Sequence, residues 1–287
     1  MNLRPVILDF DRSVGELPGA LTIDLADWQE AIRFGCSMRR MDALATKLDA
    51  ELPAQYGTVF MGSGDFHHLT WPLVRRLHGK GPFRVVVFDN HPDNMRFPFG
   101  IHCGSWVRRV AALPFVSHVH VIGITSNDVG PAHSWENYLR PLYAGKLTNW
   151  CMDVDTRWAT RIGLGKAFKV FATPDALVEQ FVAMLGQFPQ PTYLSIDKDA
   201  LSPETARTNW DQGRLLETHM NAVIDALAGR IVGSDINGEV SAYEYSTAWK
   251  RWLSHADGQE PVPAAELAAW QEQQRALNRR LLARIRP

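Results

Sequence analysis

The sequence has few cysteines and no long hydrophobic run. Its three cysteines, Cys36, Cys103 and Cys151, are odd in number and lack Cys-x-x-Cys spacing, so neither a disulfide framework nor a structural zinc site is indicated. No stretch reaches the ~18 apolar residues that a membrane span needs. The apolar run within Met1–Asp11 is too short for a secretory signal. We therefore expect a cytoplasmic protein with no membrane partner.

An excess of charge of one sign is also lacking. The chain has 30 Lys and Arg against 31 Asp and Glu, a net charge of −1 over 287 residues. Bulk attraction to nucleic acid is therefore absent, and no nucleic-acid partner is expected. What the chain does contain is 46% hydrophobic and 10% aromatic residues, which is enough to bury a full core.

Short β-rich runs recur along the chain. Eight strands are expected, at Val6–Phe10, Thr58–Met61, Arg84–Phe88, Val119–Ile124, Leu147–Met152, Phe168–Phe171, Thr192–Ile196 and Ile231–Ile236. Continuous apolar runs are typical of parallel strands, which are buried on both faces. The pattern therefore predicts an α/β protein with a mainly parallel sheet.

Helical patterns separate most of these strands. Apolar residues return at intervals of three and four residues in the segments Ser37–Leu52, His68–Leu77, Ser105–Leu113, Asp175–Leu185 and Gly213–Leu227. Because no long Ser/Gly linker interrupts the chain, we expect one domain over residues 1–287, with a C-terminal helix at about 264–286. The late arginines of that helix are interpreted as packing on the body or on another subunit, or as a surface for an anionic partner.

Polar residues follow three of the strands at the edge where parallel α/β sheets bind ligands. Asp89, His91 and Asp93 follow one strand at alternate positions, which in an extended backbone share a face. Asp197 and Asp199 follow a second strand, and a glycine turn ending in tandem histidines, residues 62–68, follows a third. Each pattern alone is typical of a turn or a helix cap, but their combination indicates a shared site.

The four aspartates of this set would repel one another in one crevice unless cations compensate them. Two divalent ions would supply +4 against the four carboxylates and could hold a bridging hydroxide. Carboxylate-rich coordination with two imidazoles favours Mn²⁺, with Fe, Co, Ni or Zn as other choices. The pattern therefore predicts a dinuclear metal site.

These motifs resemble the arginase/agmatinase (ureohydrolase) family. They are Gly62–His67, the Asp-x-His-x-Asp run Asp89–Asp93, Ser195–Asp199 followed by Pro203, and Gly238-Glu239-Val240. The resemblance implies a three-layer α/β/α sandwich around an eight-stranded sheet and a homo-oligomer. It also implies two metal ions per chain and a small-molecule substrate.

Carried over residue by residue, the resemblance implies specific roles. The metal ligands would be His67, Asp89, His91, Asp93, Asp197 and Asp199. Phe66 stands between the aspartate and the histidine of the first motif, so either His67 or His68 could be the ligand. His102 resembles a histidine that transfers protons, and Glu239 resembles a catalytic glutamate that meets the substrate guanidinium. Asn94 and Asp128 are further candidates for substrate contact, or else turn residues.

The implied activity is hydrolysis of a C–N bond in a small guanidino, formimino or amide compound by a metal-bridging hydroxide, releasing urea or a related product. The run Asp199–Pro203 departs from the family's Asp-Gly-Leu-Asp-Pro, so the natural substrate stays open. Two alternatives remain. One is a zinc-dependent deacetylase of the same superfamily. Such deacetylases use a tandem pair of histidines, which the pair His67-His68 resembles. The other is a non-catalytic arginase-like binding protein.

Two remaining features have simpler interpretations. His118 and His120 alternate on a predicted strand and are interpreted as packed or edge histidines and not as ligands. Lys198, between Asp197 and Asp199, is expected to turn away and pack its stem on the outer face of the strand end.

Overall fold

The computed structural model describes residues 3–256 and 262–285. In the described part of the chain, nine strands form one sheet in the order β2-β1-β4-β11-β10-β5-β7-β8-β9, and every neighbouring pair is parallel. Their bounds are β1 Val6–Asp9, β2 Leu21–Asp24, β4 Val59–Phe60, β5 Phe83–Phe88, β7 Val116–Ile124, β8 Leu147–Met152, β9 Phe168–Phe171, β10 Thr192–Asp197 and β11 Ile231–Asn237. A second, antiparallel pair joins β3 (Gly35–Cys36) to β6 (Ile101–His102).

The expected parallel α/β sandwich is confirmed, but the expected count of eight strands is wrong by one. All eight predicted strands are present, and the ninth is β2, whose sequence Leu-Thr-Ile-Asp carries only two apolar residues. It pairs with β1 alone, at the edge of the sheet. Because an edge strand needs only one apolar face, β2 lacks the continuous apolar run that reveals the central strands.

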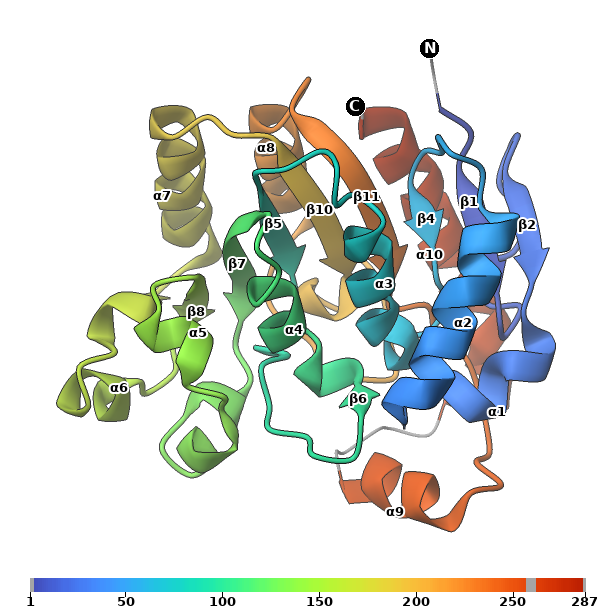
Figure 1. Ribbon diagram of the computed structural model, residues 1–287, viewed down its shortest axis with the longest axis horizontal. Coiled ribbons are helices and arrows are strands. Elements are labelled where there is room, and N and C mark those ends of the chain that lie inside the picture. Colours follow the sequence, from blue (N-terminus) through green and yellow to red (C-terminus); the bar gives the residue numbers. More distant parts are fainter. Residues whose placement is uncertain (1–2, 257–261, 286–287) are drawn as a thin grey trace.

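Helices cover both faces of the sheet (Figure 1). One face packs against α1 (Gln29–Ile32), α2 (Met38–Glu51), α3 (Thr70–Arg75), α4 (Val107–Ala111), α5 (Arg140–Tyr143) and α6 (Arg157–Arg161). The other packs against α7 (Pro174–Gln187), α8 (Glu217–Ala226) and α10 (Ala264–Arg284). Helix α9 (Ala248–Ala256) lies near the carboxyl ends of the strands. The described helices include none long and apolar enough to cross a membrane.

Local signals explain where the long helices begin. The Ser37 hydroxyl accepts a hydrogen bond from the amide of Arg40 at the start of α2 (3.4 Å). The Thr173 hydroxyl does the same for Ala176 at the start of α7 (3.3 Å), where Pro174 occupies the first turn. Such side chains satisfy amides that the helix itself leaves unpaired.

The predicted C-terminal helix is present as α10, and residue 286 lies outside the described residues. Leu277 and Leu281 are fully buried against the sheet. Its late arginines pair with α8, Arg280 with Glu217 at 2.8 Å and Arg284 with Asp225. The helix therefore packs on the body of the molecule, as one of the two interpretations of its sequence expected.

Candidate metal centre

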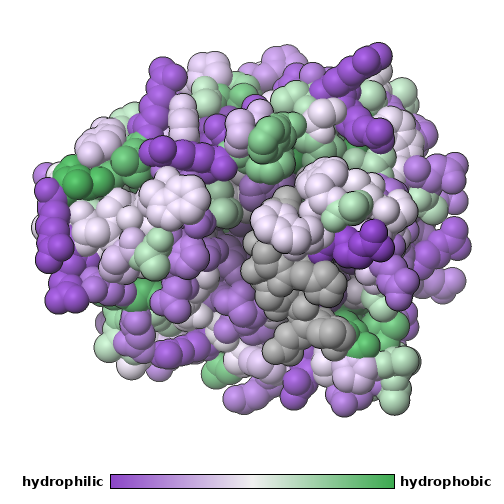
Figure 2. Space-filling view, turned by 90° about the horizontal axis from the view of Figure 1, so that it is seen from below, coloured by the Kyte–Doolittle hydropathy of each residue, from purple (hydrophilic) through white to green (hydrophobic). Residues whose placement is uncertain are grey.

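The carboxyl ends of the central strands meet at one edge of the sheet, where 3₁₀ helices and loops carry the polar side chains. The short helix η2 (Gly64–Leu69) follows β4 and presents His67, and η7 (Lys198–Ala200) follows β10. A cavity of about 770 Å³ opens there. Figure 2 looks onto this end of the molecule and shows a hollow surrounded by polar and intermediate side chains.

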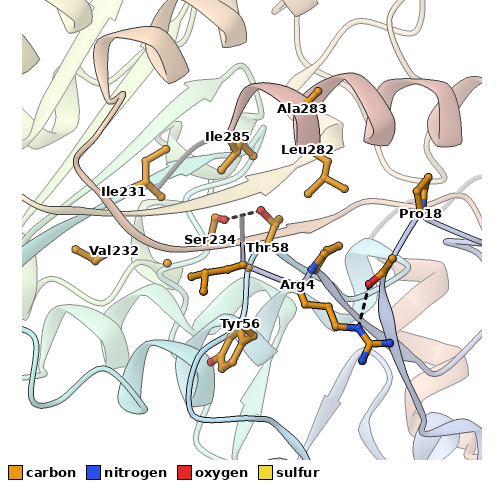
Figure 3. A pocket seen from close by; sticks show the side chains of 15 residues that line it. Arg4, Pro18, Tyr56, Thr58, Ile231, Val232, Ser234, Leu282, Ala283 and Ile285 are labelled. Carbon is orange, nitrogen blue, oxygen red and sulfur yellow. Dashed lines mark hydrogen bonds between the residues drawn. The ribbon is translucent and has the colours of Figure 1, made fainter. Parts of the chain in front are cut away.

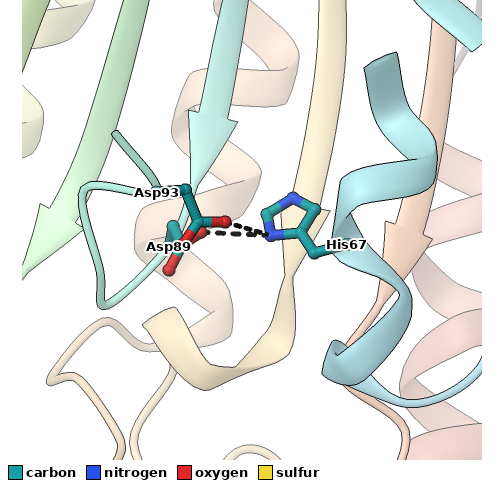
Figure 4. Close-up of side chains that lie close together, drawn as sticks. All are labelled: His67, Asp89 and Asp93. Carbon is teal, nitrogen blue, oxygen red and sulfur yellow. Dashed lines mark ion pairs between the residues drawn. The ribbon is translucent and has the colours of Figure 1, made fainter. Parts of the chain in front are cut away.

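His67 lies at the centre of a carboxylate cluster (Figure 4). Its Nδ1 atom is 3.1 Å from Asp89 Oδ2, 3.1 Å from Asp93 Oδ2 and 3.4 Å from Asp197 Oδ2. Burial disfavours the charged imidazole, but the hydrogen bonds to Asp89 and Asp93 outweigh it and raise the pKa of His67 well above its usual range. The position of Nδ1 therefore favours a cation among these oxygens.

The other ring nitrogen of His67 is held by a buried chain of hydrogen bonds. Its Nε2 atom is 3.0 Å from Ser195 Oγ, and the Ser195 hydroxyl donates to Asp235 at 2.7 Å. Tyr193 donates its hydroxyl to the same carboxylate at 2.6 Å. Since Ser195 gives its hydrogen to Asp235, Nε2–H of His67 donates to Ser195. Nδ1 is therefore the ring atom at which a metal ion would replace the proton shared with the carboxylates.

His91 belongs to a second group of ligand atoms, which also includes Asp89. Its Nδ1 atom is 3.0 Å from Asp199 Oδ2 and 3.4 Å from Asp89 Oδ1. Two sets of ligand atoms therefore lie close enough to hold an ion each, His67–Asp89–Asp93 and Asp89–His91–Asp199. Asp89 belongs to both sets, which is the arrangement that a pair of neighbouring ions requires.

The carboxylates crowd one another more than the two histidines can compensate. Burial, followed by repulsion from Asp89, raises the pKa of Asp93 and of Asp199 to about 7. Burial and repulsion from Asp199 raise the pKa of Asp197 well above its usual range. Burial also acts to raise the pKa of Asp89, but His67 and His91 outweigh it and lower this pKa. The donor set fits divalent cations, which would neutralise this excess of negative charge.

Turns, and not an extended strand, bring the motif residues together. Strand β5 ends at Phe88, and the amide of His91 donates to Asp89 Oδ1 at 2.6 Å. Asp93 adopts a left-handed backbone with φ of 45°, a conformation that Asp tolerates better than most residues. Its carboxylate accepts from the indole Nε1 of Trp106 at 2.6 Å. The expectation that Asp89, His91 and Asp93 share one face of a strand is therefore wrong, because all three follow the end of β5. The expectation that their side chains lie close together is confirmed.

His68 does not take part in the cluster. It is fully buried, and neither of its ring nitrogens has a hydrogen-bond partner. Burial lowers its pKa well below the usual range, and the nearby charge of Lys250 acts in the same direction. Of the two tandem histidines, the structure brings His67 and not His68 to the carboxylates.

Glu239 lies outside the cavity, contrary to the expected contact with a substrate. It is 1% exposed and forms a buried ion pair with Lys198. Asn278 donates to Glu239 Oε1 at 2.8 Å. The expected outward packing of Lys198 is also wrong, since this side chain is fully buried. Lys198 and Glu239 are buried together, because each residue supplies the charge that the other needs in the protein interior.

Asn94 is likewise turned away from the cavity. It is fully buried, its side-chain amide donates to the Tyr138 carbonyl at 3.0 Å, and its backbone carbonyl accepts from the Tyr138 amide at 2.8 Å. It therefore tethers the loop after β5, as the turn interpretation expected. Asp128 does line the cavity, beside Asn127 and Ser126.

His102 lines the cavity from β6. Burial, followed by the charge of Arg108, lowers the pKa of His102 to about 3. Its Nδ1 atom accepts from the Gly104 amide at 3.0 Å, so the neutral ring carries its hydrogen on Nε2. At neutral pH this side chain can donate a hydrogen bond but is not an imidazolium.

Asp211 is a cavity residue that the sequence analysis did not mark as a candidate. Asp211 Oδ1 is 2.7 Å from His91 Nε2, and Oδ2 accepts from the side chain of Asn90 at 3.0 Å. Asp211 lies in the irregular loop that follows Asp199. It belongs to no spaced motif and does not follow a strand directly, so the sequence gives no signal for it. Trp135, Trp210 and Trp252 also line the cavity.

A larger cavity, of about 810 Å³, lies at the amino ends of β1, β4 and β11 (Figure 3). Among the described residues, its lining holds no His, Asp, Glu or Cys. The hydroxyls of Thr58 and Ser234 bond each other at 2.9 Å, and Arg4 donates to the Gly19 carbonyl at 3.0 Å. Its polar groups are thus satisfied locally, and it offers no metal-binding set.

The fold and the cluster together define an α/β protein with a candidate dinuclear metal centre at the carboxyl edge of its sheet. Residues 11–144 match the arginase family. The match covers just under half of the chain, and over that part the chain is similar to the arginase family.

Three comparisons show how distant the known relatives are. An uncharacterized protein of Thermotoga maritima is 30% identical over 200 residues, which cover 69% of this chain and 63% of that protein. Agmatinase of Bacillus subtilis is 23% identical over 222 residues, covering 74% and 66%. The match therefore spans less than two thirds of either relative. The structure of proclavaminate amidino hydrolase from Streptomyces clavuligerus superposes with a TM-score of 0.56 at 16% identity, covering 99% of this chain and 93% of that one.

Proposed function

We propose that the protein is a metal-dependent hydrolase that cleaves a C–N bond in a small guanidino, formimino or amide compound. The observation that carries this proposal is the pair of ligand sets that share Asp89 beside a cavity of about 770 Å³. Agmatinase and proclavaminate amidino hydrolase, to which the chain is similar, are named for reactions of this kind.

Two divalent ions are the proposed cofactors, with Mn²⁺ the first choice for so many carboxylates. His67, Asp89 and Asp93 would hold one ion, and Asp89, His91 and Asp199 the other, with Asp197 beside His67. When bound, such ions lower the pKa of water to roughly 7 and polarise the substrate.

The other residues of the cavity would bind and orient the substrate. Asp128, Glu136 and Asp211 line it and could meet a cationic group. Glu239 is not proposed for this role, because Lys198 already neutralises it outside the cavity. Neutral His102 would donate its Nε2–H to a substrate or product nitrogen and would need no charged state to do so.

The deacetylase alternative is less well supported. That alternative uses both tandem histidines beside a single zinc ion held by Asp, His and Asp, whereas His68 is buried apart from the carboxylate cluster. Metal content separates the two proposals, since one ion per chain would favour a deacetylase and two ions a dinuclear hydrolase.

The decisive experiment combines metal analysis with a product screen. The protein, loaded with Mn²⁺ and freed of excess ion, should hold about two ions per chain. Guanidino, formimino and acylamino compounds would then be tested for release of urea, ammonia and other amines. The variant His91→Ala serves as the control for contaminating activity. Two bound ions without turnover on any compound class would favour a binding protein instead.

A further inference from the structure

A separate cavity of about 320 Å³ lies on the face of the sheet that α7 covers. Side chains from four neighbouring strands line it, with one residue from α7 and two that follow this helix. They are Arg84 of β5, His118 and His120 of β7, Thr148 and Trp150 of β8, Lys169 of β9, and Met184, Gln190 and Phe188.

Strand alternation places these polar groups on one face. His120 pairs in register with Thr148, and Trp150 pairs with Lys169. Residues two apart on a strand point to the same side of a sheet, so His118 joins His120. These residues lie in the amino-terminal or middle parts of their strands, whereas the metal centre lies beyond the carboxyl ends. The cavity is therefore distinct from the candidate active site.

The charge of this cavity is of one sign. Arg84 and Lys169 are permanent cations, and no Asp or Glu is among the described residues that line the space. Neither cation forms an ion pair with any carboxylate in the described part of the chain. Burial, followed by the charge of Arg230, lowers the pKa of Arg84. Burial and the charges of His118, Arg84 and Lys169 lower the pKa of His120 well below its usual range.

Arg84 is the most informative of these groups because it is only 2% exposed. One guanidinium nitrogen donates to the carbonyl of Phe188, which helps to cap the end of α7. Its Nε atom has no hydrogen-bond partner. A capping role alone thus leaves a buried donor and a full positive charge uncompensated, which is costly in a protein interior.

The two histidines retain hydrogen-bonding capacity as well. His118 Nε2 lies 2.9 Å from the Thr148 hydroxyl, and His120 Nδ1 accepts from the Trp150 indole at 3.3 Å. The ammonium of Lys169 lies 4.6 Å from the centroid of the Trp150 ring, which holds it at the rim. The sequence interpretation of these histidines as merely packed is therefore incomplete, since they line a space.

We propose that this cavity binds the anionic group of a small molecule, a carboxylate or a phosphate, between Arg84, Lys169 and the histidine pair. An arginine fork matches the geometry of either oxyanion. A volume of about 320 Å³ is at the low end of the roughly 300–1,000 Å³ range of small-molecule sites. The occupant is therefore a small metabolite and not a polymer.

The test is titration of the full-length, metal-loaded protein with inorganic phosphate and, separately, with acetate, a carboxylate that does not chelate the metal ions. Binding is followed by the imidazole NMR signals of His118 and His120, which report on this cavity and not on the metal centre. Saturable binding of one probe, with an upward shift in the pKa of the two histidines, is expected. The probe that binds identifies phosphate or carboxylate as the preferred group.

Variants locate the site. Lys169→Gln removes an exposed cation at the rim and should weaken binding about 10-fold, the size of one charge-assisted contact. Lys166→Gln removes an exposed lysine outside the cavity lining and should leave affinity within about twofold. Arg84→Lys tests the buried guanidinium while keeping its charge. The proposal is overturned if neither probe shifts the histidine signals, or if Lys169→Gln and Lys166→Gln bind equally well.

Discussion

At the scale of single residues, the most informative contact is the one between Asp211 and His91. Metal-binding histidines commonly donate their second ring N–H to a carboxylate, which fixes the orientation of the ring. The distance of 2.7 Å between His91 Nε2 and Asp211 Oδ1 has this form, and it directs Nδ1 toward Asp89 and Asp199.

We therefore expect Asp211→Asn to weaken Mn²⁺ binding by about 10- to 100-fold, the usual effect of losing such a contact. Calorimetric titration of the metal-free protein would measure this loss without reference to activity. Asp153→Asn is the matched control, because Asp153 is an exposed aspartate that pairs with Arg214 away from the cavity. Equal affinities in the two variants would show that Asp211 does not position His91.

The tandem histidines give a second residue-scale prediction. His67→Ala should lose bound metal, because its Nδ1 lies among three carboxylates. His68→Ala should keep its metal and change only stability, since His68 is buried apart from the cluster. Metal content after gel filtration, with a thermal melt of each variant, distinguishes the two. The opposite pattern would transfer the ligand role to His68.

His102 is the residue whose chemistry the sequence described least well. With a pKa lowered to about 3 by burial and Arg108, it is neutral at pH 7 and at pH 5. We expect His102→Ala to retain both metals and to lose roughly 10²-fold in kcat on an amine-releasing substrate. His102→Asn, which restores a side-chain N–H, should recover part of that loss. A kcat that falls between pH 7 and pH 5 in the wild type but not in His102→Ala would contradict the neutral role.

At the scale of elements, helix α9 is held to the body through Glu30. The Glu30 carboxylate accepts from the Thr247 amide at 3.0 Å and from the Tyr243 hydroxyl at 2.6 Å. Burial acts to raise the pKa of Glu30, but these hydrogen bonds outweigh it and lower the pKa to about 2. Since the folded pKa lies below the unfolded value, the contact stabilises the fold above about pH 4.3 and loses this effect as the pH falls toward 2.

We expect Glu30→Gln to loosen α9 at pH 7, because the neutral amide is a weaker acceptor for these donors. Limited trypsin digestion should then cut faster at Lys250 or Arg251 within the helix. The control is Asp27→Asn, a neighbouring exposed acid. Identical digestion rates for the two variants would mean that Glu30 does not anchor this element.

At the scale of the whole molecule, the sequence predicted the parallel sheet and the cluster because both follow from local rules. Apolar runs such as Phe83–Phe88 reveal buried strands, and acids directly after them reveal the ligand edge. The edge strand β2, Asp211 and the burial of Lys198 with Glu239 could not be predicted in the same way. Each depends on a tertiary partner far along the chain and leaves no periodic pattern.

The metal centre should dominate the stability of the whole fold. Ions that bind only the folded state stabilise it by mass action, by about 2.7 kcal/mol at 100 times the dissociation constant. We therefore expect Mn²⁺ to raise Tm and chelation to lower it. Asp197→Asn sharpens the test, because the repulsion that raises the pKa of Asp197 makes its charge destabilising when no cation compensates it.

In chelator, Asp197→Asn should thus melt at or above the temperature of the wild type, whereas in Mn²⁺ it should melt below it. Such a reversal in the order of the two melting temperatures is specific to a carboxylate that repels its neighbours and binds a cation. Asp175→Asn, at an aspartate whose side chain is 89% exposed, should show no such crossing. If Asp197→Asn kept the full rise in Tm with Mn²⁺, Asp197 would lie outside the metal centre, and the dinuclear site would rest on the two sets that share Asp89.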